Sequence, residues 1–456
     1  MKNLLRRKEN IYFIGIEGAG TSALALMYKN MGYNVSGSDN GDRFYRKALV
    51  KNDIEVFEKY DSENIPKKVK NIVYSTSIKE DNPEYKKAKK DNLEMKSYPE
   101  ALADIFNEKM GIAVCGTHGK TTTTAMLSQA LKDLDLDPSA IVGSRVIEWK
   151  ANSLTGKGEY FVIEADEYQN KLRHYNPWSV ILTSVDYDHP DFYNTFDEYK
   201  KAFSDFVEKV PKHGQLFYCN DNRDVVDVAE KAKCRKYSYG FSNESDYVVK
   251  IKENKLLQRF EVFYQEESLG DFEIKFPGRH NALNATAVIA FCHEFGLETD
   301  LVRDALASFK GTARRFERVG ERKGAVLIDD YAHHPEEIKV TLEAVKEIFP
   351  SKNIITVFHP HSFSRTEALI EDFSHSFGDT SKLIVLDIYG SARESSGRVT
   401  SKDLVDLVNK YSPRKAEHIP SIKEAIEFLE SSIGENDVIV SMGAGDVWQV
   451  THKLAK

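Results

Sequence analysis

The segment 111–124, GIAVCGTHGKTTTT, carries the residue types of a loop that binds phosphate groups. Its glycines let backbone N–H groups approach phosphate oxygens, and Lys120 adds a positive charge for the outer phosphates. The hydroxyl of Thr121 or Thr122 can hold Mg²⁺. Val114 stands where the common pattern G-x-x-x-x-G-K-[ST] has its first glycine. An ordinary glycine-rich turn would not require a lysine and hydroxyls between an apolar run and a helix. The segment therefore predicts a site for a nucleoside triphosphate.

Carboxylates follow two later apolar runs. The run 160–163 leads into Glu164, and the run 179–183 is followed by Asp188 and His189. Adjacent parallel strands would bring Glu164 and His189 to the same sheet edge, beside the phosphate loop. Oxygen and imidazole ligands at that edge suit Mg²⁺ held between protein and phosphates. Acidic loops after strands are also common without a ligand, and it is the nearby phosphate loop that favours a metal here.

A second glycine-rich turn, 15–20 (GIEGAG), lies between a predicted strand at 11–16 and a predicted helix at 21–31. Asp39 ends the next predicted strand, which is the arrangement of a dinucleotide-binding unit. Such a turn also occurs without any ligand. Because the chain has its own triphosphate loop downstream, we expect a different anion here, such as the pyrophosphate of a nucleotide-sugar. A carboxylate at Glu17 would repel that anion unless it points away.

Further polar groups accompany predicted elements in the rest of the chain. Asn281 and Asn284 begin a predicted helix on one face, where they could cap the helix, contact a nucleotide or do both. His333 and His334 are adjacent, and adjacent residues on an extended segment point to opposite faces, which disfavours a shared metal ion. Arg365 is suited to a carboxylate or a phosphate.

The composition is that of a soluble globular protein, with 456 residues of which 41% are hydrophobic and 29% are charged. A formal net charge of −8 argues against a general nucleic-acid binder. The four cysteines share no close spacing, so we expect neither a zinc site nor a disulfide framework. No apolar run approaches the roughly 20 residues of a membrane span, and the short run near the N-terminus is not a signal peptide. The expected location is the cytoplasm.

Strand–helix alternation runs through the chain and predicts an α/β protein whose parallel sheets are covered by helices. The length suggests two to four domains. We expect boundaries that divide the chain into 1–109, 110–310 and 311–456. The lysine-rich stretch 79–90 is expected to be a solvated helix face.

Taken together and in this order, the motifs resemble those of the Mur ligase family over essentially the whole chain. The matching motifs are Gly116-Thr-His-Gly-Lys-Thr-Thr, Glu164-Ala-Asp-Glu, Asp188-His189, Gly278-Arg-His-Asn-x-x-Asn284, Arg314-Arg-Phe-Glu317, Asp330-Tyr-Ala-His-His-Pro335 and Gly443-Ala-Gly-Asp446. The resemblance implies a Rossmann-like N-terminal domain for a UDP-sugar and a central P-loop ATPase-type mononucleotide-binding domain for ATP and Mg²⁺. It also implies a Rossmann-like C-terminal domain that helps to bind ATP and receives an amino acid.

The implied reaction is an ATP-dependent amide ligation in peptidoglycan precursor synthesis. The γ-phosphoryl group of ATP passes to the lactyl carboxylate of UDP-N-acetylmuramate, and the amine of L-alanine attacks the resulting acyl phosphate. Other family members join a recycled murein tripeptide to the same UDP-sugar, and this is the alternative. The element Pro360-His361-x-x-Ser364-Arg365-Thr366 resembles the alanine-adding members better. The implied partners are these small molecules, with a monomer or a weak homodimer as the assembly.

By the family's pattern, each ligand has its own set of residues. The residues implied for ATP are Gly116, Thr117, His118, Gly119, Lys120, Thr121, Thr122, Asn281, Asn284, Arg315 and Asp330. Those implied for the UDP-sugar are Gly18, Ala19, Gly20, Ser38, Asp39, Ser75 and Thr76. Those implied for the amino acid are Tyr331, His333, His361 and Arg365. The implied metal ligands are Thr121, Glu164 and His189, and the implied catalytic residues are Lys120, His189, His333 and Arg365.

Four departures from the family's pattern lie on the substrate side: Glu17, Glu58-Lys59, Gln169-Asn170 and Ser362. None touches the ATP motifs, so they bear on substrate binding and amino-acid selectivity. Two other classes stay open. A nicotinamide-dependent oxidoreductase would leave the phosphate loop unexplained, and the complete residue set argues against a non-catalytic nucleotide-binding regulator. Substrates held between three domains further imply that the C-terminal domain closes over ATP and excludes water.

Overall fold

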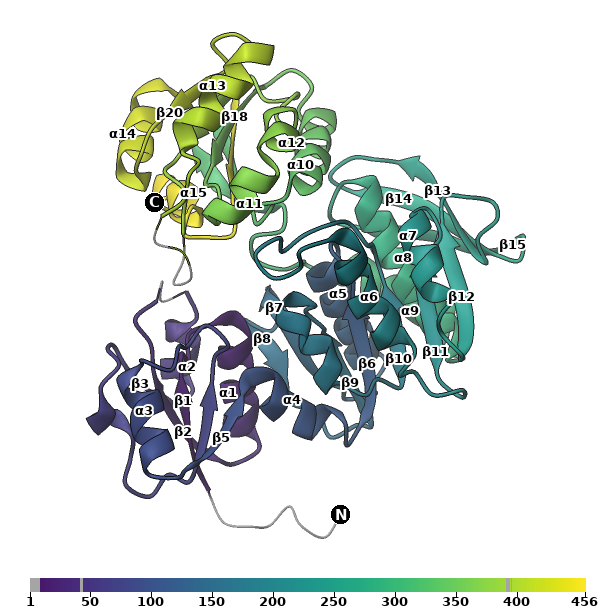
Figure 1. Cartoon of the computed structure of the whole chain (residues 1–456). Helices are drawn as coiled ribbons and strands as arrows, with labels where there is room; N and C mark the ends of the chain where they lie inside the picture. Colours follow the sequence, from purple (N-terminus) through teal and green to yellow (C-terminus); the bar gives the residue numbers. More distant parts are fainter. Residues whose placement is uncertain (1–8, 42–43, 391–393, 395) are drawn as a thin grey trace.

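The computed structural model describes residues 9–41, 44–390, 394 and 396–456. The chain forms three α/β units, each built on one sheet, which follow one another from purple through teal to yellow in Figure 1. The predicted α/β class with three domains is confirmed, while the domain boundaries stay a prediction. Within the described residues, no helix is both long enough and apolar enough to cross a membrane.

The N-terminal unit is a five-stranded parallel sheet with the strand order β3-β2-β1-β4-β5. Alternate residues of its first strand point to opposite faces, so that Phe13 and Tyr12 belong to different cores. Its elements are β1 (Asn10–Ile14), α1 (Ala19–Asn30), β2 (Asn34–Ser38), α2 (Arg46–Lys51), β3 (Glu55–Phe57), η1 (Ser62–Asn64), β4 (Asn71–Tyr74), α3 (Pro83–Lys90), β5 (Glu94–Ser97) and α4 (Tyr98–Phe106).

The central unit is a ten-stranded sheet with the order β15-β14-β13-β12-β11-β10-β6-β9-β7-β8. Its elements are β6 (Met110–Cys115), α5 (Lys120–Asp133), β7 (Ser139–Val146), β8 (Ala151–Leu154), β9 (Tyr160–Glu164), η2 (Tyr168–His174), β10 (Ser179–Leu182), α6 (Phe196–Val207), β11 (Gln215–Cys219), α7 (Arg223–Ala229), β12 (Arg235–Gly240), β13 (Tyr247–Glu253), β14 (Gln258–Tyr264), β15 (Glu267–Ile274), α8 (Arg279–Glu294) and α9 (Thr299–Ser308).

The expectation of purely parallel sheets is wrong at the sheet edges. β13, β14 and β15 form antiparallel pairs, and β8 runs antiparallel to β7. The turn between β14 and β15 places Gln265 and Glu266 in the left-handed region, with φ of 47° and 71°. Such turns usually carry Asn-Gly or Asp-Gly, and the sequence here has no such signal.

The C-terminal unit is a six-stranded sheet with the order β16-β17-β21-β18-β19-β20, parallel except for β16. Its two faces hold separate apolar cores, because Ile328 and Leu327 of one strand point to opposite sides. Its elements are β16 (Glu317–Arg322), β17 (Ala325–Asp330), α10 (Pro335–Ile348), β18 (Asn353–Phe358), α11 (Phe363–Ala368), α12 (Ile370–Ser374), β19 (Lys382–Val385), α13 (Ser401–Tyr411), β20 (Ala416–His418), α14 (Ile422–Ser432), β21 (Asp437–Met442) and α15 (Trp448–Leu454).

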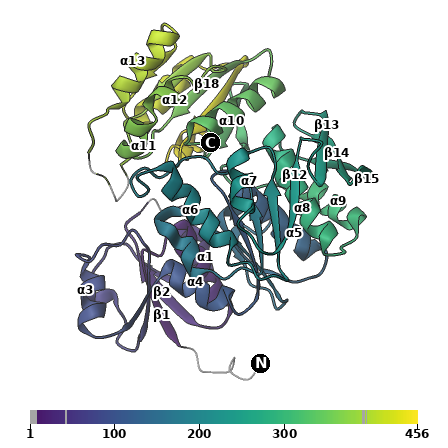
Figure 2. The same cartoon turned by 45° about the vertical axis from the view of Figure 1, so that its right-hand side comes forward.

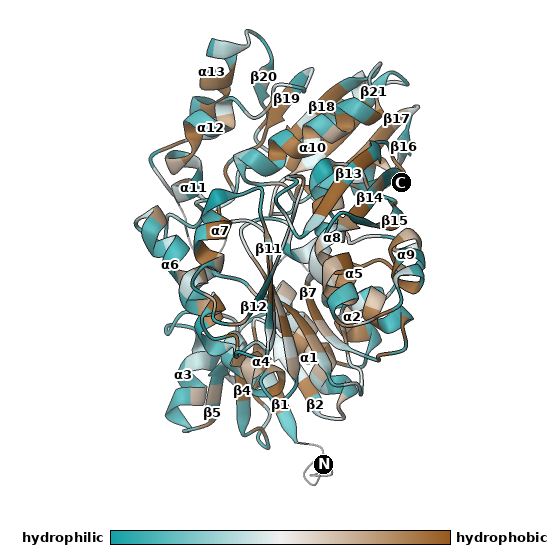
Figure 3. Cartoon of the chain, turned by 90° about the vertical axis from the view of Figure 1, so that its right-hand side faces the viewer, coloured by the Kyte–Doolittle hydropathy of each residue, from teal (hydrophilic) through white to brown (hydrophobic). Residues whose placement is uncertain are grey.

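The N-terminal and central units share one apolar core. Buried residues of β1 and α1 belong to the same cluster as those of β6, β7 and α5. Helix α1 packs against β7 and β8, and Figure 2 shows α1 beside the central unit from a second direction. The Asn152 side chain donates to the Ala19 carbonyl at 2.6 Å across this contact. Hydrophobic strands lie between helices with hydrophilic outer faces in Figure 3.

A short linker, 311–316, joins the central and C-terminal units. On the central side, the Ala313 N–H donates to the Arg145 carbonyl at 2.8 Å, at the end of β7. On the other side, the buried Arg314 guanidinium donates to the Gly445 carbonyl at 2.8 Å and to Asp329 at 3.2 Å. Each end of the linker is therefore fixed to a different unit.

Candidate active site

The two glycines of the phosphate loop are required by their surroundings. Gly116 and Gly119 have φ of 128° and 79°, in the region that favours glycine. A β-carbon on Gly116 would lie 2.3 Å from Thr183 Oγ1, and one on Gly119 would lie 2.5 Å from Asn284 Oδ1. The loop backbone thus packs directly against the end of β10 and against α8. Helix α5 begins at Lys120, so its first N–H groups lie at the loop, where they can bind an anion.

Lys120 is half-buried beside the loop that it follows. Its ammonium group donates to the Thr117 carbonyl at 3.0 Å and pairs with Glu167 Oε2 at 3.0 Å. Burial lowers the pKa of Lys120, but Glu167 and neighbouring carboxylates more than offset this and raise it above its usual value. Lys120 therefore remains a cation at the loop, as the predicted contact with outer phosphates requires.

A cavity of about 310 Å³, called here the nucleotide cavity, opens between the central unit and α10. One wall is apolar or aromatic, with Tyr239, Phe276 and Leu283, and is suited to a nucleobase. Most residues predicted for ATP line it, namely His118, Gly119, Thr121, Thr122, Asn281, Asn284, Arg315 and Asp330. The starts of α5 and α8 and the end of β17 thus converge on this cavity.

Three residues predicted for ATP lie elsewhere. Gly116 is buried beneath the loop, and Lys120 lines a second cavity. The Thr117 hydroxyl is turned into the central unit, where it donates to the Asp186 carbonyl at 2.9 Å and lies 2.8 Å from the Tyr199 hydroxyl. Its side chain holds the loop in place and does not face the nucleotide cavity.

The second cavity, of about 480 Å³, is called here the three-domain cavity because all three units supply its walls. The central unit contributes Lys120, Thr121 and Glu164, and the C-terminal unit contributes Tyr331 and Ala444. The N-terminal unit contributes five of the residues predicted for the UDP-sugar, namely Gly18, Ala19, Gly20, Ser75 and Thr76. Thr121 lines both cavities, so the two meet at the start of α5.

Ser38 and Asp39, which were also predicted for the UDP-sugar, do not line this cavity. The fully buried Ser38 hydroxyl donates to Glu84. Asp39 accepts hydrogen bonds from the N–H groups of Glu17 at 2.7 Å and Gly41 at 2.9 Å. The acidic residue that follows β2 therefore supports the glycine-rich turn through the Glu17 N–H.

The charge of Glu17 is compensated within the N-terminal unit. Its buried carboxylate pairs with the Arg46 guanidinium, which also pairs with Glu58. Glu17 and Glu58 are two of the departures noted in the sequence, and one arginine joins them. The repulsion expected between Glu17 and an anion in the turn is reduced because a cation accompanies the carboxylate.

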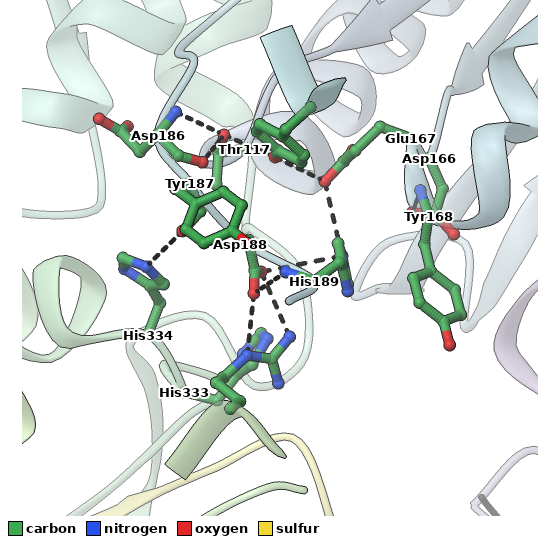
Figure 4. A network of polar contacts seen from close by, with 12 residues as sticks. Thr117, Asp166, Glu167, Tyr168, Asp186, Tyr187, Asp188, His189, His333 and His334 are labelled. Carbon is green, nitrogen blue, oxygen red and sulfur yellow. Dashed lines mark hydrogen bonds and ion pairs between the residues drawn. The ribbon is translucent and has the colours of Figure 1, made fainter. Parts of the chain in front are cut away.

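The predicted metal ligands are only partly brought together. The Thr121 hydroxyl donates to Glu164 Oε1 at 2.9 Å, and the Gly143 N–H donates to Glu164 Oε2 at 2.6 Å. His189 lies instead between Glu167 and Asp188, with Nε2 3.6 Å from Glu167 Oε1, as Figure 4 shows. The ligand atoms of Asp166, Glu167 and His189 lie within 4.8 Å of one another. Thr121 and Glu164 offer the hard oxygen donors that Mg²⁺ prefers, and His189 belongs to the neighbouring group.

The residues predicted for the amino acid do gather. The Tyr331 and His333 rings are 5.2 Å apart, the His333 and His361 rings are 6.2 Å apart, and Arg365 Nη1 lies 3.3 Å from His361 Nδ1. Arg365 also forms a buried pair with Asp188 of the central unit, with Nε–Oδ1 at 2.9 Å and Nη2–Oδ2 at 3.2 Å. Arg365 thus reaches the predicted site and at the same time ties the C-terminal unit to the central one.

Sequence reasoning missed Glu337, the third residue of α10. Its Oε1 lies 3.2 Å from His118 Nδ1 of the phosphate loop, and its Oε2 accepts the His333 N–H at 3.0 Å. Burial raises the pKa of Glu337, but His333, His118 and Arg315 outweigh burial and hold it well below its usual value. The available signal was the helix start at His334-Pro335, where a glutamate three positions after the cap completes a capping box.

The phosphate loop and the two cavities together define a class of protein: a three-domain α/β protein with a nucleotide cavity beside a second cavity that all three domains share. Family models match the chain in three consecutive parts. The Mur ligase family catalytic domain matches residues 10–110, the Mur ligase middle domain matches 114–292, and the Mur ligase glutamate ligase domain matches 314–445. The chain belongs to the Mur ligase family, whose members use ATP.

Full-length relatives and solved structures agree with this assignment. The chain is 36% identical over 448 residues to the UDP-N-acetylmuramate–L-alanine ligase of Desulfitobacterium hafniense (strain Y51), covering 98% of this chain and 99% of the relative. It is 37% identical to the ligase of the same name from Clostridium acetobutylicum, covering 99% and 98%. The crystal structure of the UDP-N-acetylmuramate–alanine ligase from Thermotoga maritima has a TM-score of 0.83 at 25% identity, covering 98% of each chain. A murein peptide ligase from Psychrobacter arcticus shares the fold, with a TM-score of 0.76 at 22% identity and 98% coverage of each chain.

Proposed function

We propose that this chain uses ATP to join L-alanine to the lactyl carboxylate of UDP-N-acetylmuramate, a step of peptidoglycan precursor synthesis. The observation that carries the proposal is the three-domain cavity. It brings Lys120 and Thr121 of the phosphate loop to face the glycine-rich turn of the N-terminal unit. The relatives named for this reaction cover the whole chain and supply the identity of the substrates.

The two cavities set the path of the first step. ATP lies in the nucleotide cavity with its base against Tyr239 and Phe276, and its phosphates run past Thr121 into the three-domain cavity. A carboxylate oxygen of the UDP-sugar attacks the γ-phosphorus there, and the bond to ADP breaks. Charge then spreads over the phosphoryl oxygens, where the Lys120 ammonium and the N-terminus of α5 stabilise it.

Thr121 and Glu164 would hold Mg²⁺ at the junction of the two cavities. When bound, the ion supplies positive charge to the phosphate oxygens. The protein's own contribution is to fix both oxygen ligands, since the Gly143 N–H holds the second oxygen of Glu164 at 2.6 Å.

The second step takes place on the C-terminal side of the three-domain cavity, where Tyr331 forms part of the wall. The amine of L-alanine attacks the acyl carbon, loses a proton, and the bond to phosphate breaks. We place the alanine carboxylate near Arg365 and His361, since a guanidinium matches a carboxylate. Arg365 still has its Nη1 directed toward His361 while its other nitrogens hold Asp188.

The pH dependence tests whether His333 acts as a base. Burial lowers the pKa of His333 to about 4, so its ring is neutral at and above about pH 6. We expect His333→Gln to lower kcat/KM for alanine at every pH without moving the midpoint of the profile between about pH 6 and 9. Steady-state rates of the variant and the parent across this range make the comparison. A profile that loses an ionisation in the variant would show that His333 titrates during the reaction.

The second candidate reaction joins a recycled tripeptide to the same UDP-sugar, and the fold shared with a murein peptide ligase favours it. Phosphate release from Mg-ATP and UDP-N-acetylmuramate separates the two when L-alanine, L-serine, glycine and L-alanyl-γ-D-glutamyl-diaminopimelate are offered one at a time. We expect the highest rate with L-alanine, and none once a chelator removes Mg²⁺. Release with the tripeptide alone would assign the chain to the recycling reaction.

A further inference from the structure

We propose that Lys171 binds the lactyl carboxylate of the UDP-sugar in the three-domain cavity, an inference that rests on the proposed function. Lys171 lies beyond the Glu164-Ala-Asp-Glu167 motif, in the segment that follows it. Its side chain is 11% exposed and lines the same cavity as Lys120, Glu164 and Gly20. A buried lysine in the wall of a cavity for an anionic substrate needs a charged partner there.

The backbone before Lys171 is shaped to direct it into the cavity. Gln169 and Asn170 both adopt left-handed conformations, with φ of 57° and 51°, which interrupt the short helical segment η2. Such conformations cost free energy in residues other than glycine and persist where the surrounding structure requires them. The turn at these two residues sets the direction in which the chain enters Lys171.

One charged partner of Lys171 is Asp166, whose Oδ2 lies 2.5 Å from Nζ. An ammonium group has three donors, and Asp166 takes one of them. This contact holds the Lys171 side chain in place, and two donors of its ammonium group remain for a ligand in the cavity.

The position of Lys171 favours the carboxylate of the substrate over its pyrophosphate. Asp166 follows Glu164 by two residues at the end of β9, and Glu164 is hydrogen bonded to Thr121 at the phosphate loop. Lys171 is thus anchored on the side of the cavity where the γ-phosphate of ATP arrives. The carboxylate must lie within contact distance of that phosphate to react, whereas we place the pyrophosphate at the glycine-rich turn.

Affinity measurements with two UDP-sugars test the proposal. UDP-N-acetylmuramate carries the lactyl carboxylate, and UDP-N-acetylglucosamine lacks it. We expect Lys171→Gln to weaken binding of the first by about tenfold or more, because hydrogen bonds to charged groups are the strong ones. We expect binding of UDP-N-acetylglucosamine and of an ATP analogue to change less than about twofold. Lys132→Gln, on the exposed surface of α5, is the matched control.

A double variant separates substrate binding from simple neutralisation of Asp166. If Lys171 only balances that charge, Asp166→Asn together with Lys171→Gln restores the affinity for UDP-N-acetylmuramate, and the proposal is wrong. If Lys171 contacts the carboxylate, the double variant stays weak and Lys171→Arg recovers part of the loss. An equal loss for both UDP-sugars would also overturn the proposal. Absence of phosphate release by the unmodified protein would instead overturn the proposed function, so the two failures are distinguishable.

Discussion

Replacing Lys120 with methionine is expected to lower kcat by about 10²- to 10³-fold, the effect of removing one preorganised charge from a phosphoryl-transfer site. The ammonium group lies at the junction of the phosphate loop and the three-domain cavity. On the proposed function, charge develops on the transferred phosphoryl group at this point. Methionine keeps much of the length of the side chain but carries no charge. Phosphate release under saturating substrates measures the effect.

Two controls make this result specific. Lys132→Met removes a lysine from the exposed face of the same helix and should leave the rate unchanged. Thermal unfolding checks that Lys120→Met remains folded. We expect it to fold because Glu167, which loses its lysine partner, still accepts a hydrogen bond from the Tyr199 hydroxyl at 3.1 Å and still lies beside His189. Turnover near that of the unmodified protein would refute the role assigned to the phosphate loop.

Replacing Arg365 with methionine is expected to destabilise the contact between the C-terminal and central units by about 3–5 kcal/mol, the cost of leaving one member of a buried ion pair uncompensated. Asp188 and Arg365 have side chains only 8% and 6% exposed, so water cannot replace the lost partner. Burial raises the pKa of Asp188, but Arg365 and three histidines lower it well below its usual value. The stabilisation is therefore present at neutral pH and is lost only in acid, as the pH falls through the depressed pKa.

Unfolding of the variant by urea, together with small-angle scattering, measures this effect. We expect an earlier transition for the C-terminal unit and less compaction with an ATP analogue and UDP-sugar. Arg398→Met is the matched control, because its side chain is 92% exposed. Adding Asp188→Asn to Arg365→Met should recover much of the lost stability, since no buried charge then stands alone. An unchanged urea transition in the single variant would show that the pair contributes nothing to docking of the units.

The features predicted well from the sequence are those that depend on local order along the chain. The strands β9 and β10 lie where their apolar runs indicated, because a buried parallel strand must be apolar throughout. The phosphate loop and Asn281 were found because their roles require fixed spacing around a helix start. For the same reason, most of the residues predicted for ATP line the nucleotide cavity.

The features that were missed depend on contacts between distant segments. Asp39 has the sequence position of a ligand contact in a dinucleotide-binding unit, but its carboxylate accepts a hydrogen bond from the Glu17 N–H. Glu164 and His189 lie at the same edge of the central sheet. The backbone of His189 is in the left-handed region, with φ of 57°, and its ring lies beside Glu167 and not beside Glu164. Spacing along the chain cannot reveal which of several nearby carboxylates a side chain will meet. Glu337 illustrates the same limit, since its partner His118 is 219 positions away.

The apolar core common to the first two units has a thermodynamic consequence. Because Phe13 and Ile112 belong to one cluster, unfolding of either unit exposes apolar surface of the other, which couples the stabilities of the two units. A ligand that binds only the folded form of one unit then protects the other as well, by mass action. On the proposed function, nucleotide-sugar bound at the glycine-rich turn therefore also protects the central unit from unfolding and proteolysis. The C-terminal unit, with two interiors of its own, gains that protection only through its interdomain contacts.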